Sequence, residues 1–115
     1  MSMLHGKSIV AGEVTNEQTD SFRSFNPATG GELEVEFYEA TPTQIDAALQ
    51  AAQSAFHIYR KKTAAEIADF LAAIAGEIEA LGDALIEQTS EETALPAERL
   101  KGERASHRQP TAYVR

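Results

Sequence analysis

The fold is decided by the stretch Leu33-Glu34-Val35-Glu36-Phe37-Tyr38-Glu39-Ala40-Thr41-Pro42-Thr43-Gln44-Ile45, in which the spacing of the apolar residues changes. In its first half, apolar and acidic residues alternate. That alternation is typical of a half-buried β-strand with Leu33, Val35 and Phe37 facing inward. In its second half the spacing becomes helical, so the sequence predicts strands before Thr41 and helices after it.

Two long helices are predicted from their capping residues and their apolar stripes. Thr41 and Gln44 form a capping box with Pro42 at the first helical position, and Thr63 and Glu66 form a second capping box. The apolar stripe of the first helix is Ile45, Ala48, Leu49, Ala52, Phe56 and Tyr59, and that of the second is Ile67, Phe70, Leu71, Ile74, Ile78 and Leu81. Each stripe follows helical spacing and marks the face that each helix would bury.

The second helix is expected to break at Gly82, after which Asp83 can cap a continuation to about Glu92. Pro96 opens a short last helix that runs to about Ala105. On the N-terminal side, the sequence shows a β-rich run at residues 8–14 and a second at about residues 22–25. A turn at residues 26–31 then precedes the strand at residues 33–37. The predicted fold class is α/β, with about three short early strands followed by two long helices and a short third.

Composition excludes several kinds of site and partner. The chain has 115 residues, a net charge of −8 and no cysteine, which excludes disulfides, thiolate metal sites and a cysteine nucleophile. An acidic chain repels phosphate backbones, so we expect no nucleic-acid partner. No apolar run approaches the roughly 18 residues that span a bilayer. The first ten residues do not resemble a secretory signal, and we therefore expect a cytoplasmic protein without a membrane partner.

The residue types that carry chemistry are not arranged as a site. His5, His57 and His107 lack metal-ligand spacing, and we interpret them as surface residues. Ser90 has no histidine neighbour in sequence, so a nucleophile is unsupported. A solvated helix face explains the spacing of Glu77, Glu79, Glu87, Glu91 and Glu92. The cluster Arg60-Lys61-Lys62 could touch a cofactor phosphate, but its place at a helix C-terminus favours a solvated cluster that complements the helix dipole. We predict no catalytic, cofactor-binding or metal residue here.

Several short motifs follow one another in a specific order. They are Asn26-Pro27-Ala28-Thr29-Gly30, Ile45-Asp46-Ala47-Ala48-Leu49-Gln50-Ala51-Ala52, Phe56, Phe70-Leu71-Ala72-Ala73-Ile74-Ala75-Gly76-Glu77-Ile78-Glu79 and Glu92-Thr93-Ala94-Leu95-Pro96. Together, over about residues 4 to 105, they resemble the opening of aldehyde dehydrogenases. The motifs His5-Gly6-Lys7, Leu81-Gly82-Asp83-Ala84-Leu85-Ile86 and Arg99-Leu100-Lys101-Gly102-Glu103-Arg104 are most similar to the α-ketoglutarate-semialdehyde (2,5-dioxovalerate) dehydrogenase branch.

The resemblance implies that residues 1–105 are the N-terminal segment of an NAD(P)-binding domain, an incomplete outer layer of strands and helices. In the full-length family a cysteine attacks the aldehyde, hydride passes to NAD or NADP, and a glutamate activates the hydrolytic water. All those residues lie downstream of the resembling segment, and this chain has no cysteine at all. Gly30-Gly31 lies between two predicted strands, so the glycine-rich cofactor turn is missing too. The expected function is a truncated segment that is inactive alone, from a parent that oxidises a semialdehyde such as 2,5-dioxopentanoate.

This chain departs from the resemblance in two places. The family usually has glycine at the position of Ala94, where a left-handed helix cap would disfavour alanine by about 1 kcal/mol. After about Ala105 the resemblance stops. A one-base shift of a compatible coding sequence for residues 106–115 reads Ala-Thr-Gly-Asn-Gln-Leu-Arg-Thr-Phe, which is similar to the family's next helix. Our hypothesis is that residues 106–115 are a non-homologous, frameshifted tail.

A second function class stays open, namely a small acidic helical module that pairs with an intact dehydrogenase or with itself. No feature marks an interface beyond the apolar stripes that the parent would bury, which favours the truncated segment. Because those stripes would face partners in a larger domain, we expect the isolated chain to self-associate or to be marginally stable.

Overall fold

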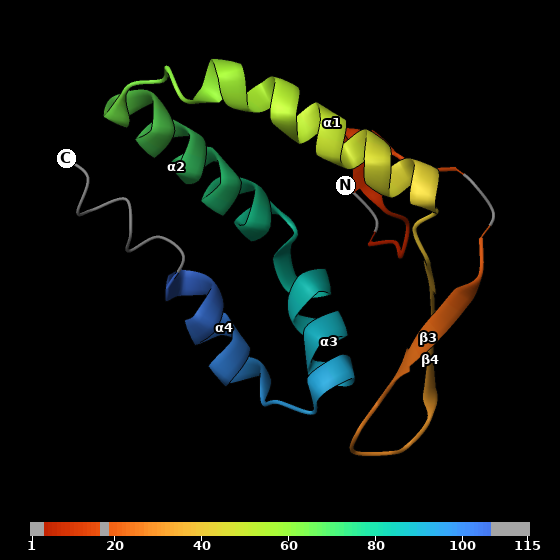
Figure 1. Ribbon diagram of the computed structural model, residues 1–115. Coiled ribbons are helices and arrows are strands. Elements are labelled where there is room, and N and C mark those ends of the chain that lie inside the picture. Colours follow the sequence, from red (N-terminus) through yellow and green to blue (C-terminus); the bar gives the residue numbers. More distant parts are fainter. Residues whose placement is uncertain (1–3, 17–18, 107–115) are drawn as a thin grey trace. The chain divides into compact units, whose positions relative to one another are not determined.

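The computed structural model describes residues 4–16 and 19–106, which form four strands and four helices (Figure 1). The strands are β1 (Ile9–Val10), β2 (Glu13–Val14), β3 (Ser21–Phe25) and β4 (Glu32–Tyr38). The helices are α1 (Pro42–Tyr59), α2 (Ala64–Ala80), α3 (Gly82–Thr93) and α4 (Ala97–Ser106). The predicted α/β class is confirmed, and the change from strand to helix falls where the apolar spacing changes.

The early strands form two separate two-stranded sheets. β1 pairs antiparallel with β2, with Ile9 opposite Val14 and Val10 opposite Glu13. Ala11 and Gly12 between them have φ values of 52° and 84°, and positive φ at both central residues is what a type I′ hairpin turn requires. The β-rich run at residues 8–14 therefore supplies two strands instead of one, because its glycine reverses the chain.

The second sheet is the hairpin of β3 and β4. The turn between them is closed by the Asn26 backbone nitrogen, which donates to the Gly31 carbonyl at 2.8 Å. The alternation predicted for β4 is confirmed, since Leu33, Val35 and Phe37 are half-buried and the glutamates between them are exposed. Phe37 also stacks on a ring of β3, that of Phe22, with centroids 5.7 Å apart.

Gly6 joins the N-terminal segment to β4. It forms an isolated parallel bridge with Phe37, and the Tyr38 backbone nitrogen donates to the Gly6 carbonyl at 3.0 Å. A Cβ atom at Gly6 would overlap the carbonyl oxygen of Glu36. The close approach of these two backbones therefore requires glycine at this position.

Both predicted capping boxes are present. At the start of α1, the Gln44 nitrogen donates to Thr41 Oγ1 at 3.1 Å and the Thr41 nitrogen donates to Gln44 Oε1 at 2.9 Å. At the start of α2, the Glu66 nitrogen donates to Thr63 Oγ1 at 3.2 Å and the Thr63 nitrogen donates to Glu66 Oε2 at 2.7 Å. Each box satisfies helix N–H groups that have no partner within the helix.

The predicted second helix is divided into α2 and α3. Gly82 takes a φ of 62°, a conformation that stops an α-helix and favours glycine. The expectation that Asp83 caps the continuation is wrong, because the N-cap of α3 is Leu81 and no side chain bonds there. Asp83 lies two positions after the N-cap, within the first turn, where a carboxylate still complements the helix dipole.

The described residues divide into two compact units, one with residues 5–16, 19–24 and 34–61 and one with residues 4, 25–33 and 62–106. In the first unit, α1 contacts β1. In the second, α3 packs against α4, and Arg104 Nη1 of α4 donates to the Gly82 carbonyl at 2.9 Å. In the part of the chain that the structure describes, no helix is both long and apolar enough to cross a membrane.

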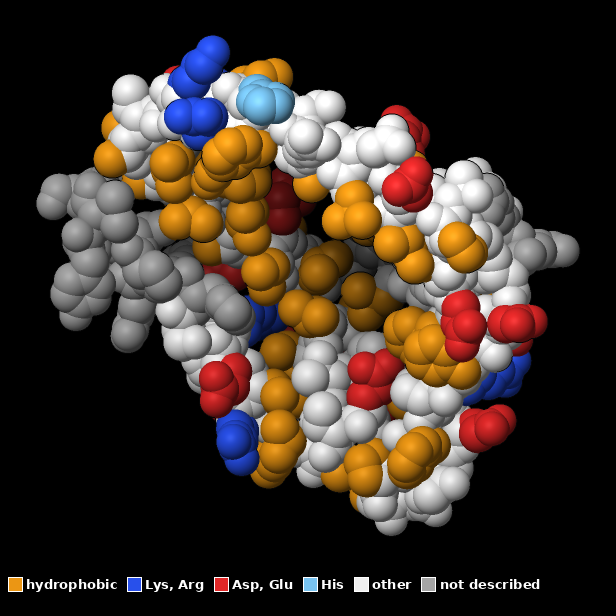
Figure 2. Space-filling view, viewed as in Figure 1, with side chains coloured by type: hydrophobic (Ala, Val, Ile, Leu, Met, Phe, Trp, Pro, Cys, Tyr) orange, Lys and Arg blue, Asp and Glu red, His pale blue; other side chains and the backbone are white. Residues whose placement is uncertain are grey.

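Little apolar surface is buried in the described residues. The buried apolar side chains are Ala75, Ile86 and Leu100. Large hydrophobic side chains stay exposed, as Figure 2 shows in orange, and they are Ile9, Val14, Phe22, Phe25, Ile45, Leu49, Phe56, Ile58, Tyr59, Phe70, Leu71 and Ile74. Several residues of the helix stripes are thus exposed, although a stripe of that width normally faces a core.

Candidate functional site

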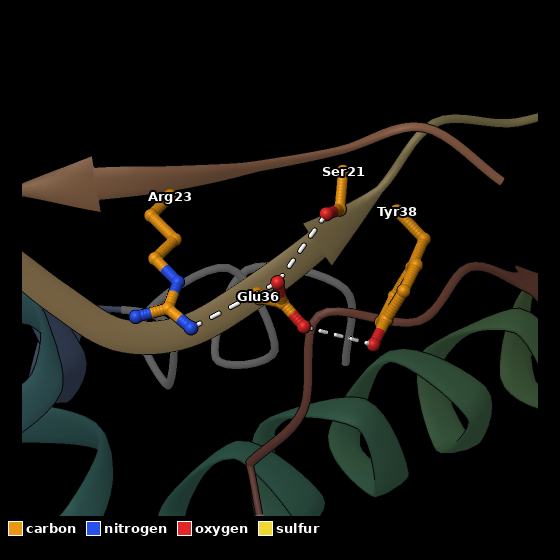
Figure 3. Close-up of polar contacts among 4 residues, drawn as sticks. All are labelled: Ser21, Arg23, Glu36 and Tyr38. Carbon is orange, nitrogen blue, oxygen red and sulfur yellow. Dashed lines mark hydrogen bonds and ion pairs between the residues drawn. The ribbon is translucent and has the colours of Figure 1, made fainter. Parts of the chain in front are cut away.

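A polar cluster surrounds Glu36 on the β3–β4 hairpin (Figure 3). Ser21 Oγ donates to Glu36 Oε1 at 3.4 Å, and Tyr38 Oη donates to Glu36 Oε2 at 3.2 Å. Arg23 Nη2 lies 3.8 Å from Glu36 Oε1. Residues two apart on a strand point to the same side, so Ser21 with Arg23 on β3 meets Glu36 with Tyr38 on β4.

This cluster has the properties of a strand-pairing contact. The Arg23 and Glu36 side chains are 44% and 43% exposed, and an ion pair in that setting contributes about 0 to 1 kcal/mol. Both Glu36 oxygens already accept hydrogen bonds. The sequence did not predict this cluster. Its signal is one pair of polar residues two positions apart on each strand, and the sequence does not state the register that brings the two pairs together.

One surface pocket of about 270 Å³ lies beside the β1–β2 hairpin and the first turn of α1. It is lined by Val10, Glu13, Val14, Thr15, Asn16, Thr43, Gln44 and Ala47. Its most buried polar side chain is Gln44, whose Oε1 accepts the Thr41 N–H of the capping box. Among the described residues of the lining, Glu13 is the single ionisable side chain, so these residues offer no pair of groups for acid–base chemistry.

Gly30 and Gly31 are the adjacent glycines nearest in pattern to a phosphate-binding turn. They close the turn between β3 and β4, whereas a dinucleotide fingerprint needs a strand followed by a helix. Their backbone N–H groups are used within the turn, Gly30 donating to the Asn26 carbonyl at 2.7 Å and Gly31 to Thr29 Oγ1 at 3.2 Å. These residues do not fit a dinucleotide phosphate.

His5 and His57 each make a local contact. His5 and His57 are exposed; His5 Nδ1 accepts the Lys7 N–H at 3.2 Å, and His57 lies beside the Phe56 ring. His107 lies outside the described residues. Within residues 4–16 and 19–106, no group of three or more His, Cys, Asp or Glu side chains could hold a metal ion.

The other candidate groups make local helix contacts. Ser90 Oγ donates to the Leu95 carbonyl at 2.8 Å, just beyond the end of α3. Glu92 Oε1 accepts Gln88 Nε2 at 3.0 Å along α3. Glu77, Glu87 and Glu91 are exposed, and Glu79 is half-buried. These positions agree with a solvated helix face.

The basic cluster at the end of α1 is held by neighbouring side chains. The Arg60 guanidinium lies 5.5 Å from the centre of the Phe56 ring, a distance at which a cation–π attraction operates. Lys62 Nζ lies 3.8 Å from Glu66 Oε1. These contacts support the interpretation of the cluster as a helix-end feature.

Comparison with known proteins gives a consistent family. Residues 14–113 match the profile of the aldehyde dehydrogenase family. Alpha-ketoglutaric semialdehyde dehydrogenase 2 of Azospirillum brasilense is 40% identical over 102 residues, which are 88% of this chain and 19% of that protein. Alpha-ketoglutaric semialdehyde dehydrogenase of Acinetobacter baylyi is 38% identical over 103 residues, which are 90% of this chain and 20% of that protein. The chain thus spans about a fifth of the length of these relatives.

Proposed function

The chain belongs to the aldehyde dehydrogenase family, and from that premise we propose that it is the N-terminal segment of an NAD(P)-dependent dehydrogenase that oxidises a semialdehyde. The relatives that it matches are named for α-ketoglutaric semialdehyde. We propose the same substrate for the parent of this segment, and a cytoplasmic location.

The observation that carries this proposal is the exposure of apolar side chains on α2. Phe70, Leu71 and Ile74 on α2 are 52%, 42% and 40% exposed, although α2 has the apolar spacing of a helix that faces a core. A scaffold of this kind has apolar surface that a longer dehydrogenase chain would cover. The proposed role of this segment is structural support for a nucleotide-binding core that other residues build.

We propose that these 115 residues alone do not oxidise aldehydes. The family's mechanism needs a cysteine nucleophile, and this chain contains no cysteine. The turn at Gly30-Gly31 does not fit a dinucleotide. The purified chain, mixed with α-ketoglutaric semialdehyde and NAD or NADP, should give no reduced cofactor. Measurable turnover that follows the chain through purification would contradict this part of the proposal.

A chimera tests the segment assignment itself. Residues 4–105 of this chain would replace the matching segment of the Azospirillum brasilense relative, and NAD(P) reduction by α-ketoglutaric semialdehyde would be measured. We expect a folded, active enzyme, because the elements that the core needs are supplied in order. A chimera with a shuffled segment of the same composition is the control and should not fold. A folded chimera without activity would count against the proposal.

We also propose that residues 106–115 arise from a reading-frame break near Ala105. The family match reaches residue 113 and so extends into this tail, which does not favour a break at Ala105. The proposal therefore rests on the compatible coding sequence of residues 106–115. Residues 107–115 lie outside the described part of the chain. Sequencing the gene decides the matter. A dehydrogenase continuation in another frame just past codon 105 is the expected result, and its absence would defeat the frameshift.

A second candidate function is an interaction module that binds an intact homologue, and the exposed apolar residues favour it. A pull-down of a full-length dehydrogenase by the tagged chain tests this candidate. Stoichiometric binding that survives washing would support the module, and no binding would leave the truncated segment as the single proposal.

A further inference from the structure

The junction between α2 and α3 lacks the side-chain cap that stands at the start of α1 and α2. Each of those two helices begins with a capping box, whereas the N-cap of α3 is Leu81, which forms no side-chain cap. Gly82, the next residue, has a φ of 62°, a conformation that glycine adopts without the steric cost that other residues meet. The direction of the chain at this junction therefore depends on the backbone conformation of one glycine.

The apolar spacing of α2 continues through the junction. The residues of this row are Ile67, Leu71, Ile74, Ile78, Leu81 and Leu85. The steps between them are four, three, four, three and four residues, and such steps keep side chains on one face of a continuous α-helix. The sequence of residues 64–93 is thus compatible with one straight helix as well as with the two helices of the structure.

The contacts between α3 and α4 lie on one side of this glycine. α3 packs against α4, and Ile86 and Leu100 are buried apolar side chains of these two helices. Arg104 Nη1 donates to the Gly82 carbonyl at 2.9 Å. That carbonyl follows the Cα atom of Gly82, so rotation about the N–Cα bond moves α2 relative to α3 and does not separate Arg104 from its acceptor. α3 and α4 can therefore move as one body.

We propose that Gly82 is a hinge about which α3 and α4 rotate together relative to α2. In the bent arrangement, which the structure shows, Gly82 has a positive φ. In the straight arrangement, Gly82 has helical dihedral angles and residues 64–93 form one helix. That helix gains the backbone hydrogen bonds that the junction interrupts, but it holds a glycine in its interior, where glycine is unfavourable. These opposing effects keep the two arrangements close in free energy. A partner that contacts α2 and α3 together would shift the population towards the arrangement that it fits.

Spin labels on α2 and α3 measure the bend. The natural chain contains no cysteine, so Ala73→Cys and Glu91→Cys, both at exposed positions, give one label on each helix. In a straight helix these two positions lie on the same face and about 27 Å apart, at a rise of about 1.5 Å per residue. Double electron–electron resonance should show a major population at a shorter distance and a minor population at the straight-helix distance. Dilution with unlabelled chain removes distances between copies.

Substitutions at the hinge should shift the two populations. Gly82→Ala should raise the ratio of straight to bent chains about tenfold, because alanine disfavours positive φ and favours a helix interior. Gly82→Asn should leave the bent arrangement predominant, because asparagine tolerates the left-handed conformation. The matched control is Gly76→Ala within α2, where a Cβ atom meets open space, and it should leave the distances unchanged.

The natural chain alone can overturn the proposal. If it shows the shorter distance only, Gly82 is a fixed bend, and this conclusion holds even when a variant fails to fold. An unchanged distribution in Gly82→Ala, or an equal shift in Gly76→Ala, would also overturn the hinge. The labelled chains are measured without substrate or cofactor, so failure of the hinge leaves the chimera assay of the parent's activity untouched.

Discussion

Ala94 has a backbone conformation that disfavours alanine. It is the C-cap of α3 with φ 58° and ψ 17°, in the left-handed region, and its nitrogen donates to the Ser90 carbonyl at 2.8 Å. The sequence predicted this conformation, because the similar motif in the family has glycine at this position. The structure confirms it, and Ala11 in the first hairpin turn has a similar φ of 52°.

Replacing Ala94 with glycine should raise the free energy of unfolding by about 1 kcal/mol, because glycine adopts positive φ without a Cβ clash. Urea unfolding followed by circular dichroism measures the change. The matched control is Ala73→Gly in the middle of α2, which should lower the free energy of unfolding by about 1 kcal/mol. If both glycine variants shift stability in the same direction, the conformational argument fails.

Gly6 shows the opposite case, a glycine that the packing requires. Gly6→Ala should destabilise the bridge to β4 by about 1 to 3 kcal/mol, because the new methyl group overlaps the Glu36 carbonyl. Faster hydrogen exchange of the Tyr38 amide, which donates to the Gly6 carbonyl, reports the loss. Gly76→Ala in α2 meets open space and should stabilise its helix slightly. Unchanged Tyr38 exchange in Gly6→Ala would refute the close approach.

At the scale of elements, α1 and α2 both begin with a capping box, and the two boxes differ in the side chain at the N3 position. The third residue of the capping box is an amide in Gln44 of α1 and a carboxylate in Glu66 of α2. The hydrogen bond from the Thr63 backbone, with help from the Thr63 side chain and from the charge of Lys62, holds the pKa of Glu66 below its usual value of 4.5. The start of α2 therefore depends on pH through a group that α1 lacks.

The sign of that dependence follows from the lowered pKa. The charged form of Glu66 stabilises the folded state above pH 4.5, and this contribution is lost as the pH falls through the lower pKa of the folded state. Glu66→Gln retains an acceptor for the Thr63 N–H but does not titrate. The stability difference between the natural chain and Glu66→Gln should therefore shrink on acidification, as measured by urea unfolding at pH 7 and pH 3. A difference that is the same at both pH values would contradict the assignment.

At the scale of the molecule, the small buried core sets the behaviour of the chain. Ile86 on α3 and Leu100 on α4 are 5% and 7% exposed and belong to the unit in which these two helices pack. Most of the predicted apolar stripes stay open to solvent. Marginal stability or self-association, the outcome expected from the sequence, remains a prediction that this distribution of exposed side chains supports.

Ile86→Ala should lower the free energy of unfolding by about 2 kcal/mol or more, because it removes one of the few buried side chains. The matched control is Ile9→Ala, in which the same atoms are removed from a side chain that is 65% exposed, and its effect should stay below about 0.5 kcal/mol. Thermal or urea unfolding compares the two. Equal losses would show that Ile86 is not part of a packed core.

The sequence by itself determined the features that depend on neighbouring residues. Both capping boxes, the alternation of β4, the break at Gly82 and the left-handed Ala94 were predicted correctly, because each rests on side chains within a few positions. The family was recognised from short motifs in order. The sequence also showed that no cysteine is present to act as the nucleophile.

Only the tertiary structure decided what depends on residues far apart in the sequence. The contact of Gly6 with Glu36 and Phe37, the polar cluster around Glu36 and the split of the early run into β1 and β2 all follow from strand pairing. The apolar spacing marked the stripe of α1, but the fold left Ile45, Leu49 and Phe56 exposed. Spacing states which residues share a face, whereas burial requires a partner surface, which only the folded chain reveals.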